Sequence, residues 1–321
     1  MLSKNNSKIL VIVLLVLLAV YAVMHFANNS ESNMKTDLVA VDTVKVNKIV
    51  IMPPGAPKIV LTKDGGQWQL FAKGETHPAD KTRVKYILEN LLNLKAKSVV
   101  ATEEKQWKRY EVSDSLGTRI KLMNDDKTLS DIILGKFNFI AAKNSNTALY
   151  GNRPQGDMIS YVRLYNDDNV YSVDGMIKMS IGAEPDNYRN KNFVNLQPSQ
   201  IKKINFTYPD TLPFILEKED QGWKIDGQAA DSAAVARYLS LFENVNGTKF
   251  AKNLDLNKTP FIGKIKIELI DAPPVVFTAY SPDSNKIVMH SSLNKDAWFD
   301  DDSGKLHKRF YVRPSYFFKK E

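Results

Sequence analysis

One pattern of hydrophobic and polar positions occurs twice along this chain. Residues 38–68 align with residues 193–223 without a gap, and each copy contains short runs of β-branched and aromatic residues bounded by Pro, Gly, Asp and Asn. Such runs between turn residues are typical of β-strands. The pattern predicts three strands in each copy, "IVI", "KIVLT" and "WQLF" in the first and "KINFTY", "FILEK" and "WKI" in the second.

A helical pattern follows the third strand in both copies. Asp80 and Asp231 precede it and are expected to cap the helices, because an Asp side chain accepts hydrogen bonds from free backbone N–H groups. Apolar positions then recur at helical spacing, at Val84, Ile87, Leu88, Leu91 and Leu92 in the first copy and at Val235, Tyr238, Leu239, Phe242 and Val245 in the second. We expect Asn246-Gly247 to end the second helix. An apolar stripe on one side indicates a helix that lies on a sheet.

Further strands are predicted after each helix. They are "TRIKLM", "SDIILG", "SYVRLY" and "VYSVD" in the first copy and "GKIKIELI", "PVVFTAY", "NKIVMH" and "FYVR" in the second. In this alignment Tyr161-Val162-Arg163 matches Tyr311-Val312-Arg313. Hairpins rather than strand–helix–strand crossovers favour an antiparallel sheet. The expected fold class is α+β, with two tandem repeats of an antiparallel sheet that carries one main helix on a face, at residues 38–185 and 186–321.

The N-terminal segment indicates a membrane anchor. Residues 9–27 carry no formal charge and follow Lys4 and Lys8, and a membrane-spanning helix needs about 20 apolar residues. The end of this run, Met24 to Asn28, is a poor cleavage site, so an uncleaved anchor is favoured over a cleaved signal peptide. The positive-inside rule then predicts a cytoplasmic tail at residues 1–8, a tether at residues 28–37, and the bulk of the chain in the periplasm of a bacterium, held at the inner membrane.

Several of these segments together resemble a known family. "DTVKVNKIVI", the Trp68 strand followed by Pro78-Ala79-Asp80, "YVR" and "YRNKNFVNL" are similar to an uncharacterised bacterial family of domains of unknown function. Members of that family are membrane-anchored extracytoplasmic proteins, and some are encoded beside gliding-motility-type ABC transporters. The resemblance implies a link to a membrane transporter. It implies no activity and no catalytic residues.

Composition narrows the possible chemistry. The chain has no cysteine, which excludes disulfides, cysteine nucleophiles and thiolate metal sites. Its four histidines lack metal-ligand spacing, and "GNRPQGDM" has an Asp where a phosphate-binding loop needs Lys. "FDDDSGK" lacks the pattern of a calcium loop and is interpreted as a hairpin turn. We therefore expect no cofactor, no metal and no catalytic site.

The net charge of +8 is spread over modest clusters that are typical of solvated faces. Nucleic acid is not an expected partner of a chain outside the cytoplasm. Arg163 and Arg313 are the candidate binding residues, because the same Arg recurs among strand formers; a structural ion pair is the favoured interpretation of both. Trp68 and Trp223 are expected to pack on their own repeats.

The predicted function is that of a non-catalytic, membrane-anchored binding protein. Its expected partner is an integral membrane complex such as an ABC transporter, for which it would be an accessory subunit. Two alternatives remain, a binder of envelope polysaccharide or another acidic polymer, and an uncharacterised enzyme. An exposed aromatic row flanked by Lys or Arg would favour the polymer binder. A deep pocket with convergent polar groups and perturbed pKa values would favour the enzyme.

Overall fold

The computed structural model describes residues 36–141, 156–252, 254–284, 286–302 and 304–319, together with Leu14 and residues 16–18. Most of the predicted anchor at residues 9–27 therefore lies outside the described residues, as do the predicted cytoplasmic tail and nearly all of the tether. Within the described part, no helix has the length and apolar character required to cross a membrane.

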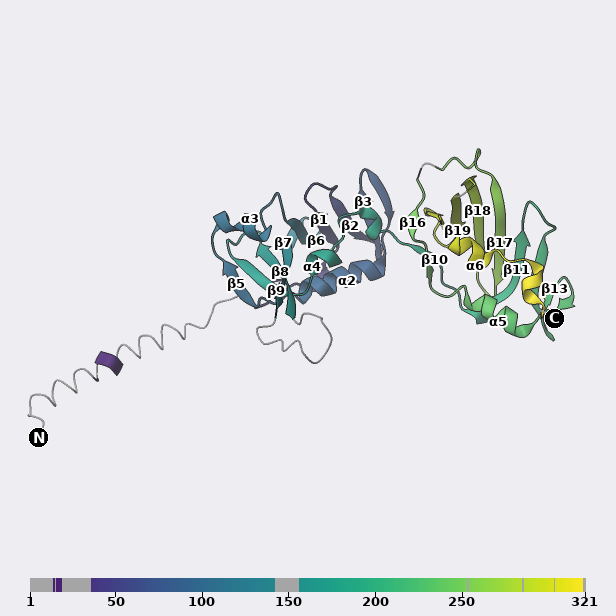
Figure 1. Cartoon of the computed structure of the whole chain (residues 1–321), viewed down its shortest axis with the longest axis horizontal. Coiled ribbons are helices and arrows are strands. Elements are labelled where there is room, and N and C mark those ends of the chain that lie inside the picture. Colours follow the sequence, from purple (N-terminus) through teal and green to yellow (C-terminus); the bar gives the residue numbers. More distant parts are fainter. Residues whose placement is uncertain are drawn as a thin grey trace, which may run out of the picture. The chain divides into compact units, whose positions relative to one another are not determined.

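Two large, mostly antiparallel sheets form the bulk of the described chain (Figure 1). The first has nine strands in the order β4-β3-β2-β1-β6-β7-β8-β9-β5, and the second has nine strands in the order β14-β13-β12-β11-β17-β18-β19-β20-β16. The two orders are the same when strands are matched in chain order. The predicted repetition of one sheet architecture is thus confirmed.

The strands of the first sheet have the following bounds. They are β1 (Lys48–Met52), β2 (Ile59–Asp64), β3 (Gln67–Ala72), β4 (Glu75–Pro78), β5 (Ser98–Ala101), β6 (Thr118–Asn124), β7 (Lys127–Ala141), β8 (Gly156–Leu164) and β9 (Val170–Asp174). Those of the second sheet are β11 (Ile201–Thr207), β12 (Phe214–Glu219), β13 (Gly222–Ile225), β14 (Gln228–Ala229), β16 (Lys249–Phe250), β17 (Phe261–Leu269), β18 (Val275–Asp283), β19 (Lys286–Ser291) and β20 (Trp298–Asp300). A separate two-stranded sheet joins β10 (Asn192–Val194) to β15 (Val245–Asn246).

Each repeat has one main helix that begins directly after the predicted capping Asp. The helices are α2 (Lys81–Leu92), α3 (Trp107–Tyr110), α4 (Ile177–Ser180), α5 (Ser232–Ser240) and α6 (Lys305–Phe310), with short 3₁₀ turns at Thr43–Lys45, Glu104–Gln106, Pro185–Asn187, Pro198–Gln200 and Pro314–Phe317. Asp80 Oδ1 accepts hydrogen bonds from the Thr82 and Arg83 amides, and Asp231 Oδ1 accepts one from the Ala234 amide. These bonds satisfy amides that a helix leaves free at its start.

Backbone hydrogen bonds at the ends of the repeats also recur. Ala96 N donates to Thr36 O at 2.7 Å, and Gly247 N donates to Lys191 O at 2.8 Å. At the other end, the Asp80 amide donates to Tyr188 O and the Asp231 amide donates to Phe317 O, both at 2.8 Å. The duplication therefore extends from strand order down to individual backbone bonds.

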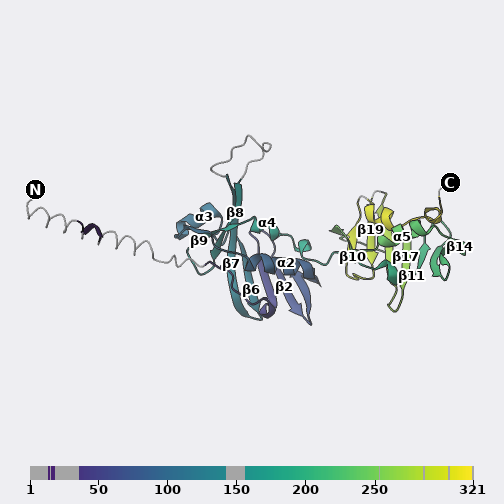
Figure 2. The ribbon, with the colours of Figure 1, turned by 90° about the horizontal axis from the view of Figure 1, so that it is seen from below.

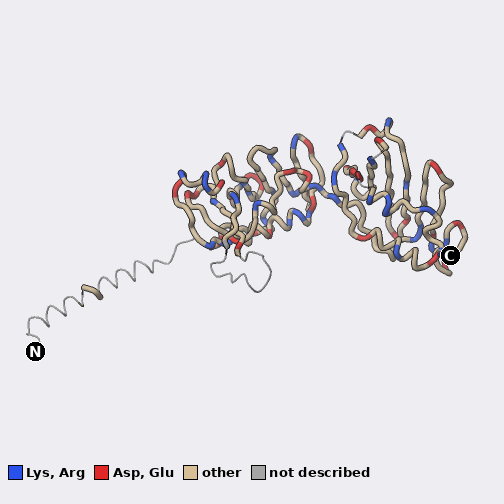
Figure 3. Tube along the Cα trace, viewed as in Figure 1, with Lys and Arg blue, Asp and Glu red and all other residues tan. Residues whose placement is uncertain are grey.

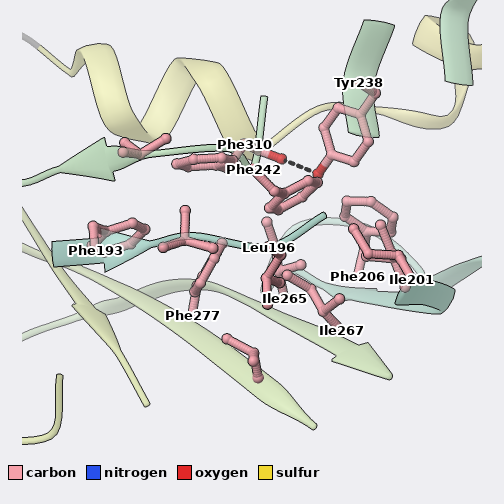
Figure 4. Close-up of a cluster of buried hydrophobic side chains, with 14 of the residues drawn as sticks. Phe193, Leu196, Ile201, Phe206, Tyr238, Phe242, Ile265, Ile267, Phe277 and Phe310 are labelled. Carbon is pink, nitrogen blue, oxygen red and sulfur yellow. Dashed lines mark hydrogen bonds between the residues drawn. The ribbon is translucent and has the colours of Figure 1, made fainter. Parts of the chain in front are cut away.

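The core of the second repeat is built largely from aromatic rings (Figure 4). Phe242 and Phe310 stack with ring centroids 5.2 Å apart, and Phe193 stacks on Phe310 at 5.7 Å. Tyr238 is fully buried on α5, and its hydroxyl donates to Phe310 O at 2.7 Å. Burial raises the pKa of Tyr238 well above its ordinary value, which favours the protonated hydroxyl that donates this bond.

The two tryptophans predicted to pack on their own repeats do so. Trp68 is buried on β3, and the partly buried Trp223 of β13 packs against the core of the second repeat. Their carbonyls accept equivalent hydrogen bonds, from the Ala79 amide and the Ala230 amide, both at 2.9 Å.

The second main helix is shorter than predicted. The pattern predicted a helix that continues to Val245 and ends at Asn246-Gly247, but α5 ends at Ser240. Val245 instead pairs with Val194 in the small sheet. Close packing requires a glycine at position 247, because a Cβ there would lie 2.0 Å from Cδ1 of Phe299.

The end of the second repeat also differs from the prediction. "FYVR" was expected to be a strand, but Phe310 ends α6 and residues 311–313 have no regular structure. The last strand is β20, and "FDDDSGK" connects it to α6 rather than forming a hairpin turn. The Asp301 carboxylate accepts a hydrogen bond from the His307 amide, which favours helix formation there, and Leu306 and Phe310 bury one side of the helix.

Candidate binding surfaces

Arg163 lies inside the protein, at 2% side-chain exposure, on β8. Its Nε donates to Val112 O at 3.0 Å, its Nη1 to Tyr165 O at 2.9 Å and its Nη2 to Asp114 Oδ1 at 2.8 Å. The guanidinium also stacks over the Trp107 ring at 3.6 Å. Burial lowers the pKa of Arg163, and Asp114 partly opposes that effect. The side chain is thus committed to contacts within the chain.

These contacts hold residues 102–117 against the first sheet, and we call this segment the cover. The segment between β5 and β6 contains α3, and Trp107 Nε1 of α3 donates to Asp168 O at 3.0 Å. Beneath this segment lies a small apolar core on the face of the sheet that carries Arg163. Its buried members are Ala101, Val112, Ile133, Ile159, Tyr161 and Val170. The hydrogen bonds of Arg163 to Val112 and Asp114 therefore hold the cover against the sheet.

Arg313 has a different environment. It follows α6, with a half-exposed side chain that forms a two-pronged ion pair with Asp210 at 2.7 and 3.2 Å. It also donates to Thr211 Oγ1 and lies 4.6 Å from the centre of the Tyr208 ring. Hydrogen bonds from Arg313 lower the pKa of Asp210. Arg163 and Arg313 are therefore not equivalent positions, although both form an ion pair with an Asp.

The hairpin of β7 and β8 forms a projecting arm on the first sheet, visible in Figure 2. β6 pairs with β7 only up to Leu134, so beyond that point β7 is paired with β8 alone among the described strands. The register shifts between Leu134 and Phe137. Gly135 lies at this irregularity, and a Cβ there would be 2.2 Å from Tyr110 O, so the backbone passes too closely for any side chain.

Large apolar side chains are exposed at the base of the arm. Phe137 and Phe139 lie on one face of β7, opposite Ser160 and Met158 of β8, and are 42% and 40% exposed. The Ser160 hydroxyl on that face accepts a hydrogen bond from the Ile177 amide, which places the α4 segment beside it. This segment adds two further exposed side chains. We call Phe137, Phe139, Met176 and Met179 the Phe/Met surface.

Charged groups border the Phe/Met surface. Lys178 forms an ion pair with Glu111 at 3.5 Å. Together with Lys136, Phe137 and Met179, these two residues line an open, shallow cavity of about 360 Å³. Apolar side chains inside a polar rim are the usual composition of a protein-binding site.

A row of aromatic side chains crosses the second sheet. Phe261 of β17 lies opposite Tyr280 of β18, and His290 of β19 lies opposite Trp298 of β20. Ring centroids are 5.8 Å apart from Phe261 to Tyr280, 5.7 Å from Tyr280 to Trp298 and 4.6 Å from Trp298 to His290. All four side chains are partly exposed. We call them the aromatic row.

The aromatic row lies on the outer face of the sheet, because the neighbouring positions Met289 and Phe299 point into the core. Tyr280 and Trp298 converge across β19, and Val288 between their strands is only 1% exposed. Burial in this stack lowers the pKa of His290, while its hydrogen-bonding contact with Lys295 O opposes that effect.

Charges of both signs are interspersed along both sheets (Figure 3). Beside the aromatic row, Asp300 is buried and lies 3.2 Å from Lys286 Nζ and 3.5 Å from Lys249 Nζ, and Lys249 also pairs with Asp302 at 3.6 Å. Among the described residues, no group of three or more His, Asp and Glu side chains could hold a metal ion.

Comparison with known proteins gives a family match only. A family model described as a domain of unknown function, DUF4340, matches residues 68–260, which is more than half of the chain. No curated protein and no solved structure matches the chain. The matched region begins in β3 of the first sheet and ends just before β17 of the second, so it includes parts of both repeats.

Proposed function

The chain belongs to the DUF4340 family of domains of unknown function, and from this premise we propose that it is a non-catalytic, membrane-anchored binding protein that acts as an accessory subunit of an integral membrane complex such as an ABC transporter. The observation that carries the proposal is the Phe/Met surface. Monomeric proteins rarely leave several large apolar side chains together in water, and such patches mark interaction sites.

The energetics of the Phe/Met surface suit protein docking. Fully burying an exposed Phe or Met side chain contributes about 1.5–3 kcal/mol, and these four side chains, which are 40–64% exposed, would each contribute roughly half of that to an interface. The flexible thioethers of Met176 and Met179 adapt to a partner's shape. Beyond Leu134 no described strand pairs with the outer edge of β7, and this edge adds backbone groups that a partner strand can pair with.

The N-terminal anchor supports a partner within the membrane. The tether at residues 28–37 spans at most about 3.3–3.6 Å per residue. It therefore keeps the folded repeats close to the bilayer, which raises their effective concentration for other membrane proteins. Docking through a moderate apolar surface is then sufficient for stable assembly.

The test is co-purification of the tagged full chain from native membranes in a mild detergent. We expect an integral membrane protein complex to be recovered in constant ratio with the chain. The double variant Phe139→Asp/Met179→Asp should reduce that recovery at least about tenfold, because it places two charges in the centre of the interface. Both side chains are exposed, so the variant should fold.

Leu212→Asp is the matched control. Leu212 is 88% exposed on the second repeat, so the substitution makes the same change of character away from the Phe/Met surface. It should leave recovery unchanged. The proposal fails if the double variant retains the partner fully, or if the purified chain alone turns over a small molecule.

A further inference from the structure

We propose that the aromatic row of the second sheet binds an uncharged glycan chain, with pyranose rings stacked on Tyr280 and Trp298. This site lies on a different repeat from the Phe/Met surface and does not depend on the accessory-subunit proposal. The inference rests on three features of the second sheet: a partly exposed outer face, the arrangement of the rings, and the balance of charges around them.

The outer face is partly exposed at the aromatic row, and the connection beside it is short. In the first sheet, residues 102–117 connect β5 to β6 and form the cover that Arg163 holds in place. The matching connection in the second sheet, residues 251–260, contains no helix among its described residues. Its ends are held beside the aromatic row, with Ala251 N donating to Trp298 O at 2.8 Å and Ser281 N donating to Pro260 O at 2.9 Å. The partly exposed rings therefore occupy the face that is buried in the first repeat.

The rings form a stacking surface for sugars. The ring centroids of Tyr280 and Trp298 lie 5.7 Å apart on either side of β19, whose Val288 is buried. One face of a pyranose ring presents C–H groups, which are attracted to the negative face of an aromatic ring. Neighbouring centroids 4.6–5.8 Å apart give a continuous track rather than a single contact. A chain of linked sugars matches such a track better than a single small molecule does.

Polar groups for sugar hydroxyls lie beside the rings. Thr278 lies opposite both Lys264 and His290, on the same face as the aromatic row. Asp300 also lies on this face, opposite Val288. Its Oδ1 accepts no hydrogen bond from a described residue, although Lys286 Nζ is 3.2 Å away. Because that oxygen is buried, the groups on this face that sugar hydroxyls can reach are the partly exposed Thr278 and the exposed Lys264.

The local charge favours a glycan over a nucleic acid or an acidic polymer. Lys249 and Lys286 both form ion pairs with Asp300, and Lys249 also pairs with Asp302. A single-stranded nucleic acid needs stacking rings together with a strongly positive groove for its phosphates. The aromatic row has the rings without that excess of positive charge, so its ligand is an uncharged polymer.

The experiment is a titration of the purified full chain in a detergent without a sugar headgroup. The probes are cellohexaose and chitohexaose, two uncharged pyranose hexamers, with hexagalacturonate and a (dT)₁₂ oligonucleotide as charged comparisons. Tryptophan fluorescence and calorimetry report binding. We expect saturable binding of at least one uncharged hexamer, with weaker binding of both charged probes.

Trp298→Ala and Tyr280→Ala should each weaken that binding about tenfold or more, which corresponds to 1.4 kcal/mol. Trp298→Tyr keeps an aromatic ring and should retain binding within about threefold, so it distinguishes stacking from misfolding. Phe71→Ala, on an exposed aromatic of the first sheet, is the matched control and should bind as the unmodified chain does. Melting temperatures confirm that each variant is folded.

Three results would overturn the proposal. One is the absence of saturable binding of either uncharged hexamer. Another is unchanged binding in folded Trp298→Ala and Tyr280→Ala variants. The third is tighter binding of (dT)₁₂ or hexagalacturonate than of both uncharged hexamers, which would assign the site to a charged polymer.

Discussion

At the scale of single residues, Arg163 and Arg313 show how one residue type takes different roles in two copies. Arg163 is buried on β8, where it donates to Val112 and Asp114 of the segment before β6 and to Tyr165 directly after β8. Arg313 lies at the surface, where its ion pair with Asp210 is open to water. The shared "YVR" letters suggested equivalence, yet one copy lies on β8 and the other follows α6. Three matching residues carry too little information to fix a register when the neighbouring segments differ in length.

This contrast gives a paired prediction of stability. Arg163→Ala should lower the free energy of unfolding by about 2–3 kcal/mol, because it leaves buried carbonyls without donors and removes the stacking on Trp107. Arg313→Ala should lower it by less than about 1 kcal/mol, as is usual for exposed ion pairs. Urea unfolding of the full chain, followed by circular dichroism and tryptophan fluorescence, measures both. Equal losses in the two variants would contradict the structural role of Arg163.

At the scale of elements, the sequence predicted the parts of the fold that depend on local patterning. The strands β1 to β3, their counterparts β11 to β13, and the starts of both main helices follow from alternating apolar runs and the two Asp caps. The end of α5 and the position of α6 could not be predicted this way. Val245 continues the helical stripe by spacing, but pairing with β10 outweighs that preference.

The candidate surfaces were missed for a related reason. Phe137 and Phe139 alternate with polar residues in "KFNFIA", which is the pattern of an ordinary strand. Their exposure follows from the pairing of β6 with β7, because the first residue of β6, Thr118, lies opposite Leu134 and β6 does not extend beside Phe137 and Phe139. The aromatic row joins side chains from four strands, and sequence spacing says nothing about their proximity before the strand order is known.

Gly247 provides a prediction at the scale of the element. Gly247→Ala should destabilise the second repeat by about 1–3 kcal/mol, because the added methyl group collides with the buried Phe299 ring. The same unfolding assay measures this loss. Adding Phe299→Leu to Gly247→Ala should cost less than the sum of the two single substitutions, since the smaller side chain removes the collision. Strict additivity would show that the two positions do not compete for space.

At the scale of the whole molecule, one sheet architecture is present twice with different outer faces. The first copy uses a long connection to cover its outer face, and the second leaves the aromatic row partly exposed. The first repeat therefore carries the projecting arm of β7 and β8, and the second repeat carries the aromatic row. Both lie on a chain whose first residues carry the predicted membrane anchor.

The anchor can be tested on the intact protein. We expect mass spectrometry of the membrane fraction to find residues 1–27 still attached, with a total mass of about 36.3 kDa. Replacing residues 9–27 with a cleavable signal should release a folded protein whose recovery with a membrane complex falls strongly. A natural N-terminus near Asn28, or full activity of the released form, would refute this view of the anchor.

Backbone bonds tie both chain ends of each repeat to segments that flank its main helix. Near the start of the second repeat, Lys191 O accepts from Gly247 N, seven residues after α5, and near its end Phe317 O accepts from Asp231 N at the start of α5. Thr36–Ala96 and Tyr188–Asp80 repeat this arrangement around α2. A pulling force along the chain therefore acts first on these backbone bonds near the helix. If the bound partner moves relative to the membrane, these few backbone bonds set the load at which a repeat begins to open.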